Sequence, residues 1–208
     1  LETTRSTDEF QALANDFDRI GKKETKQWLP SYYAALAYLQ KGRMQMQSGK
    51  MSELSINANA ADKYLDQAEA IAGKDNSEIH LLRKMAYSLR MMENPAERYM
   101  TDGMKAMEEL KKAETLDPNN PRVALIKAED TYFTPEQYGG SKEKGLEQFK
   151  TALDKFNAFV SSDSLEIPVF KFEIVPLDAH TEVKAEAFAD PLAGKEVEAD
   201  VPASPATD

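Results

Sequence analysis

Apolar residues recur every three or four positions through most of the first 160 residues, and this spacing constrains the fold more than any other feature of the sequence. The clearest example follows Ser141, a residue suited to cap a helix. Its apolar stripe consists of Leu146, Phe149, Leu153, Phe156 and Val160. A period near 3.6 residues is that of a helix with one buried face. The pattern therefore predicts an all-α core.

Helix-start and helix-stop signals divide this core into successive helices. Ser6 and Glu9 have the spacing of a capping box, and Asp75 and Glu78 repeat it. Proline suits the first turn of a helix, where its missing N–H costs nothing. Such prolines occur at Pro30 and in the pairs Asn94-Pro95 and Asn120-Pro121, and Gly73 is placed to end a helix that starts near Glu53. The helix after Pro30 is apolar on most of its circumference, so we expect it to be buried.

The pattern changes after Val160. Residues 169–175 alternate apolar and charged side chains, the period of a half-buried strand, and residues 181–188 can return as a second strand. The last 30 residues, 179–208, carry seven acids and two lysines, which is half of the net charge of the chain. We expect a helical domain over 1–160, followed over 161–208 by a linker, a strand-like segment and an acidic tail.

Composition excludes several classes of function. The chain has 36 acidic and 26 basic residues, and its net charge of −10 argues against a nucleic-acid partner. It contains no cysteine, which excludes thiolate metal sites and cysteine nucleophiles. Its only histidines are His80 and His180, so most acid–base and nucleophilic catalysis is also excluded. No apolar run is long enough to span a membrane. We predict a protein that is not an enzyme, with no catalytic residues, no metal and no cofactor.

A short internal repeat refines the helical prediction. In three of the predicted helices a small residue is followed at +4 by a large apolar one and at +7 by another small one. The three sets are Ala61, Leu65, Ala68; Ala106, Leu110, Ala113; and Gly145, Phe149, Ala152. Small residues at these positions let two helices of a hairpin approach closely, while the large one fills the space between hairpins.

This spacing, together with the run KAMEELKKAETLDPNNPRVALIKAED, resembles the tetratricopeptide-repeat family. The intervals of 45 and 39 residues between repeats exceed the standard of about 34, so the resemblance is to divergent repeats. It implies a right-handed superhelix of about three helical hairpins plus an N-terminal helix. The alternating segment described above adds a short β-like extension at the C-terminus. The resemblance also implies a non-catalytic scaffold that binds a protein or peptide in its concave groove.

The resemblance places several side chains in that groove. They are Tyr32, His80, Arg83, Tyr87, Arg90, Arg122 and Tyr132. Arginine and aromatic side chains suit a carboxylate-bearing ligand, so the predicted partner is an acidic peptide. The alternative is that these are ordinary solvated positions on helix exteriors.

The methionines also allow two interpretations, a ligand-binding surface or part of the core. Nine are present, and several are close in sequence between Met85 and Met107. Methionine-rich surfaces adapt to varied ligands, but most of these residues have helical packing spacing. We predict that they fill the core.

The segments WLPSYYAALAYL and PEQYGGSKEKGLEQFKTAL are similar to exported repeat proteins of Bacteroidetes-type bacteria. This implies a periplasmic or cell-envelope location after removal of a signal, with a cytoplasmic location as the alternative. It also gives the second functional prediction, a periplasmic or lipid-anchored accessory component of an envelope or glycan-uptake system. The sequence predicts no oligomeric state.

Overall fold

The computed structural model describes residues 6–159, 170–177 and 180–187. Its helices are α1 (Thr7–Lys23), α2 (Leu29–Gln47), α3 (Leu54–Ala72), α4 (Ser77–Glu93), α5 (Pro95–Arg98), α6 (Met104–Leu116), α7 (Pro121–Phe133) and α8 (Lys142–Ala158). Short 3-10 helices cover Met51–Glu53 and Glu136–Tyr138, and a π-helical turn, Tyr99–Gly103, joins α5 to α6. The predicted all-α fold is confirmed.

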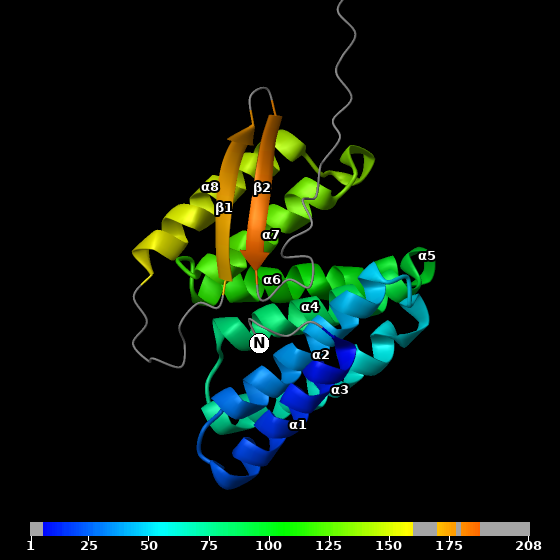
Figure 1. Cartoon of the computed structure of the whole chain (residues 1–208), viewed down its shortest axis with the longest axis vertical. Coiled ribbons are helices and arrows are strands. Elements are labelled where there is room, and N and C mark those ends of the chain that lie inside the picture. The colour runs from blue at the N-terminus through cyan, green and yellow to red at the C-terminus, as the bar shows by residue number, and fades with distance from the viewer. Residues whose placement is uncertain (1–5, 160–169, 178–179, 188–208) are drawn as a thin grey trace, which may run out of the picture.

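The helices stack as a series of hairpins (Figure 1). The pairs are α2 with α3, α4 with α6, and α7 with α8, while α1 packs on α2 at the N-terminal end. Helix α4 also packs on α3 and α2, and α6 contacts α7. Each hairpin therefore packs both its own two helices together and one of them against the neighbouring hairpin.

The predicted helix signals act as expected with one correction. The Oγ of Ser6 accepts the N–H of Glu9 at 3.2 Å, and Gly73 ends α3 in the left-handed region with φ of 65°. The cap of α4 is Asn76 rather than the expected Asp75, because the Asn76 side chain accepts the N–H of Glu78 at 2.9 Å. Both spacings are allowed for a cap, and the cap is the residue with extended backbone that directly precedes the helix, which is Asn76 with φ of −139° and ψ of 122°.

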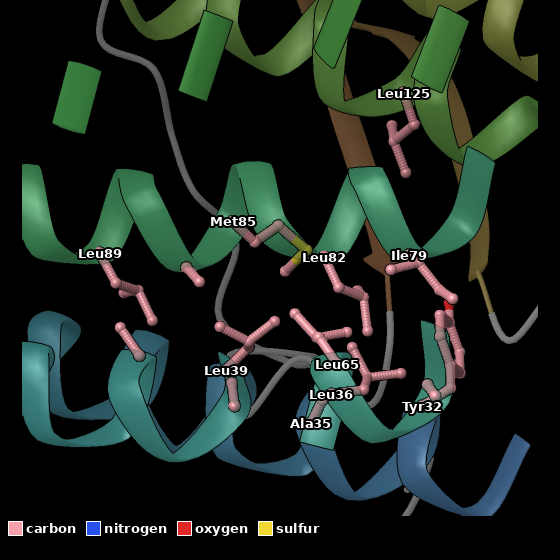
Figure 2. Packing of buried hydrophobic residues seen from close by; sticks show 14 of the residues in the cluster. Tyr32, Ala35, Leu36, Leu39, Leu65, Ile79, Leu82, Met85, Leu89 and Leu125 are labelled. Carbon is pink, nitrogen blue, oxygen red and sulfur yellow. The ribbon is translucent and has the colours of Figure 1, made fainter. Parts of the chain in front are cut away.

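The main core lies between α2, α3 and α4 (Figure 2). Side chains of α4 point down onto those of α2 and α3, and Leu125 of α7 lies on the other side of α4. The labelled α4 residues are Ile79, Leu82, Met85 and Leu89, and they face Tyr32, Ala35, Leu36, Leu39 and Leu65. The expectation that α2 is buried on most sides is confirmed.

The small residues of the repeat allow close helix approach, as predicted. A Cβ at Gly145 of α8 would lie 2.6 Å from the Cβ of Tyr132 in α7. Ala61, Leu65 and Ala68 of α3 are fully buried. The small–large–small spacing therefore marks true contact positions between helices.

Charged contacts join α4 to α7. Lys84 Nζ donates to Asp130 at 2.6 Å, and the Arg122 guanidinium donates to Glu78. We call these four residues the charged seam. A small apolar cluster lies with it, made of Leu81, Ala113, Val123 and Ile126. The contact between α4 and α7 thus combines charged and apolar side chains.

The C-terminal part contains a two-stranded ribbon. Strand β1 (Phe170–Leu177) pairs antiparallel with β2 (His180–Ala187), and Ile174 stands opposite Val183. Both predicted strands are confirmed, and β1 contacts α8. The division into 1–160 and 161–208 stays a prediction, and most of the acidic tail, residues 188–208, lies outside the described residues.

Candidate functional site

Three methionines form an exposed apolar stripe on the helix that begins at Pro95. Met100, Met104 and Met107 have exposed fractions of 73%, 47% and 59%. They are separated by four and three residues, so they lie on one side of the helix over two turns. We call these three residues the methionine face. Tyr99, half exposed, adjoins it at the start of the π-helical turn.

The way this helix packs on α4 explains why its other side is exposed. Gly103 in the π-helical turn is buried, and a Cβ there would lie 2.9 Å from Sδ of Met91 in α4. Ala106, Glu109 and Ala113 continue the buried side. Small residues thus bring α6 close to α4 and leave the methionine face directed to solvent. A π-helical turn of this kind is frequent at functional sites.

Around the methionine face, two carboxylates are paired with neighbouring cations, whereas one lysine is exposed. Asp102 pairs with Arg98 at 3.3 Å, and Glu108 pairs with Lys112 at 2.9 Å. The hydrogen bond from Lys112 lowers the pKa of Glu108. Lys111 continues the stripe one turn beyond Met107 and is exposed. These two carboxylates are therefore paired with cations of their own helix, while Lys111 stands at the end of the apolar stripe.

A second cation lies beside the stripe. Lys105 is exposed, and its Nζ lies 5.5 Å from the centroid of the Tyr87 ring. That ring also receives the guanidinium of Arg90, with Cζ at 5.3 Å. A contact with an aromatic face leaves the ammonium group of Lys105 open to an anion. The methionine face and these two lysines suit an apolar ligand that also carries negative charge.

The arginines of the predicted groove are held by carboxylates of their own chain. Arg83 donates to Asp66 and Glu69 of α3, both at 2.8 Å. Burial alone lowers the pKa of Arg83, and these two hydrogen bonds outweigh burial and raise it. Arg90 donates in the same way to Asn59 and Asp62 of α3. An acidic ligand at these positions has to replace carboxylates that are already bound.

Arg122 and Tyr32 belong to a buried polar cluster. Both donate to the carboxylate of Glu78, and Tyr32 does so at 2.7 Å. Burial, together with the neighbouring charge of Glu78, raises the pKa of the Tyr32 hydroxyl well above its usual value. The Phe159 ring covers the guanidinium, whose Cζ lies 5.7 Å from its centroid. The cluster joins α2, α4 and α7 and has the character of a structural contact.

His80 is also buried, and its ring is fixed from a distant part of the sequence. Its Nδ1 lies 2.6 Å from a carboxylate oxygen of Glu109 in α6. Asp75 approaches the other ring nitrogen at 3.9 Å. The sequence offers no acid one turn away on the same helix, so this partner was missed. With its side chain only 11% exposed, the His80 imidazole is not placed to meet a ligand.

The predicted groove residues therefore do not form one open surface. Tyr132 is half-buried and contacts the ring of Phe149 edge-on, with centroids 5.8 Å apart. Tyr87 lies beside Lys105, whose Nζ is 5.5 Å from the centroid of its ring. The peptide-binding role of the seven residues stays a prediction.

The prediction that the methionines fill the core is correct for Met85 and wrong for the methionine face. Helical spacing gives the same pattern for a buried and for an exposed stripe, so spacing alone does not separate them. The physical difference is the buried Gly103 on the neighbouring side, which selects the side that packs.

The described residues contain no group of three or more histidine, cysteine, aspartate or glutamate side chains placed to hold a metal ion. Thioether sulfurs remain as soft donors on the methionine face. None of the helices in the same part of the chain is long and apolar enough to cross a bilayer.

Comparison with known proteins gave one informative match. No family model matches the chain, and no curated protein matches it. Among solved structures, the HusA haemophore from Porphyromonas gingivalis is similar, with a TM-score of 0.66 and 33% sequence identity. The similarity covers 76% of this chain and 76% of the haemophore chain.

Proposed function

Because the chain belongs to the family of the HusA haemophore, we propose that it binds haem as cargo and catalyses no reaction of its own. The observation that carries this proposal is the likeness to a haem-carrying protein over 76% of both chains at 33% identity. The composition supports it, because a chain without cysteine and with two histidines has few groups for catalysis.

The methionine face is the proposed haem site. A porphyrin is a flat apolar ring, and Met100, Met104 and Met107 offer it adaptable apolar side chains on one side of a helix. Full burial of one such side chain contributes roughly 1.5–3 kcal/mol. The two propionates of haem are anions, and Lys105 and Lys111 stand where they can pair with them.

Contact with the ring, rather than an imidazole ligand, carries the proposed binding. Of the two histidines, His80 is buried with its ring engaged by Glu109, and His180 begins strand β2, far along the sequence from the methionine face. A thioether of the methionine face can ligate haem iron, as methionine does in cytochromes. Parallel titrations with haem and with metal-free protoporphyrin separate the two contributions, and we expect similar affinities for both.

The proposal is tested by titrating haem into the full chain and three variants. In the first, all three residues of the methionine face are changed to Gln, which keeps the length and removes the apolar character. In the second, all three are changed to Leu, which keeps the apolar character and removes sulfur. The third, Met85→Leu, alters a buried methionine and serves as the control.

We expect the triple Gln variant to bind haem at least about tenfold more weakly, a loss of about 1.4 kcal/mol, and the other two variants to bind nearly as well as wild type. Failure of wild type to bind haem would overturn the proposed function. Unchanged affinity in the triple Gln variant would place haem on another surface.

The proposal extends to fold family and location. The three hairpins and their buried small residues support a divergent tetratricopeptide-like superhelix. A haem carrier acts where haem is captured, which supports a location in the bacterial envelope or outside the cell rather than the cytoplasm. An accessory role in uptake across the envelope fits the same proposal.

A further inference from the structure

The methionines of this chain differ sharply in their access to solvent. Those of the methionine face are 47–73% exposed, whereas Met85 is 7% exposed. The remaining methionines are half-buried, and they are Met44, Met46, Met51, Met91 and Met92. Oxidation of a thioether requires contact with the oxidant, so exposure sets the order in which these residues react.

No thiol competes with these thioethers for an oxidant, because the sequence contains no cysteine. A cysteine thiolate is the usual first target of peroxide in proteins. In its absence the most exposed thioethers become the most accessible reducing groups of the chain. They lie together on one helix, at Met100, Met104 and Met107.

We infer that the methionine face is a modification site, at which peroxides oxidise the thioethers to sulfoxides and so weaken haem binding. The inference rests on the proposed function. In each event a peroxide transfers one oxygen atom to sulfur. The O–O bond breaks as the S–O bond forms, sulfur loses two electrons, and hydrogen peroxide leaves as water.

The consequence for binding follows from the change in polarity. A sulfoxide is strongly polar, and its oxygen has to be desolvated when an apolar ring covers it. The same change costs the fold little, because the three side chains already meet solvent. Oxidation of the methionine face should therefore weaken ligand binding without destabilising the fold. Oxidation of Met85, within the α2–α3–α4 core, would destabilise the fold and so impair binding as well.

The test treats the haem-free full chain with hydrogen peroxide and maps the oxidised methionines by peptide mass spectrometry. Haem is then titrated before treatment, after treatment, and after reduction by methionine sulfoxide reductases. We expect the methionine face to be oxidised first, haem affinity to fall by at least about tenfold, and reduction to restore it. Circular dichroism should show unchanged helix content throughout.

The triple Leu variant of the methionine face is the matched control, and we expect its haem affinity to be insensitive to peroxide. If untreated wild type does not bind haem, the proposed function fails and the inference fails with it. If untreated wild type binds and the oxidised protein binds equally well, the inference alone is overturned. It is also overturned if the Leu variant loses as much affinity on treatment as wild type, because the lesion then lies elsewhere. Should that variant not bind haem at the outset, recovery of wild-type binding with the reductases decides the matter.

Discussion

The Nε of Arg122 donates to both carboxylate oxygens of Glu78, at 3.0 Å and 2.9 Å. The two side chains are only 9% and 15% exposed, and Tyr32 donates to the same carboxylate. One carboxylate thus holds groups from α2 and α7 against α4. A pair so deeply buried is costly to break, because the remaining charge loses its counter-ion and has little water around it.

We expect Arg122→Met to lower the free energy of unfolding by roughly 3–5 kcal/mol, since it leaves the Glu78 carboxylate buried without its cation. The double variant Arg122→Met/Glu78→Gln should recover part of that loss, because no uncompensated charge remains. Urea unfolding of wild type, the two single variants and the double variant measures the coupling. Simple additivity of the two single effects would contradict the prediction.

Two glycines within helices should respond in opposite directions to alanine. A Cβ at Gly42 of α2 would lie 2.7 Å from Cδ1 of Leu89, so Gly42→Ala overpacks the core and should cost roughly 1–3 kcal/mol. At Gly21 of α1 the nearest atom, Cβ of Pro30, is 3.5 Å away, an ordinary contact. Gly21→Ala should therefore stabilise by roughly 0.5–1 kcal/mol through helix propensity. Thermal unfolding of both variants checks the two signs.

Lys105 and Lys111 should contribute to haem affinity through the propionates. We expect Lys105→Gln/Lys111→Gln to weaken haem binding roughly three- to tenfold at low salt, with less effect at high salt where exposed charges are screened. Lys150→Gln, at an exposed position of α8, is the control. A loss that is the same at every ionic strength would argue against a charge interaction.

The Tyr32 hydroxyl should make stability depend on alkaline pH. Its pKa is raised in the folded protein by burial and by Glu78, so the neutral hydroxyl is favoured there. Its contribution is fully present below the unfolded tyrosine pKa of about 10 and is lost as pH rises above that value. Urea unfolding should show Tyr32→Phe less stable than wild type at pH 8, by about 1 kcal/mol, with the difference shrinking toward pH 11. A constant difference would contradict this.

The sequence predicts the helices and their contacts well where the signal is local. Gly145 predicts a position where two helices approach closely, and the structure places Tyr132 of the preceding helix against it. The cap of α4 is misplaced by one residue, because Asp75 and Asn76 are both good capping residues and only backbone geometry chooses between them.

The site is less predictable because it depends on contacts between distant helices. His80 meets Glu109 from 29 residues away, and Arg90 is engaged by Asp62 of another helix. No pattern along one helix reveals such partners. For the same reason an arginine-rich groove is expected from spacing, while the structure brings acids to each of its arginines.

The charged seam adds directional contacts to a core that is otherwise apolar. Apolar packing runs from α2, α3 and α4 into α7 and α8, where Leu125 and Phe149 belong to the same cluster. Apolar side chains alone allow more than one arrangement of two helices, whereas the hydrogen bonds from Arg122 to Glu78 and from Lys84 to Asp130 require a defined geometry. The charged seam therefore fixes how α7 lies on α4, and its loss should cost the outer hairpin its defined position before it costs the helices themselves. Helix α6, which carries Met104 and Met107, contacts both α4 and α7 and lies where that change would occur.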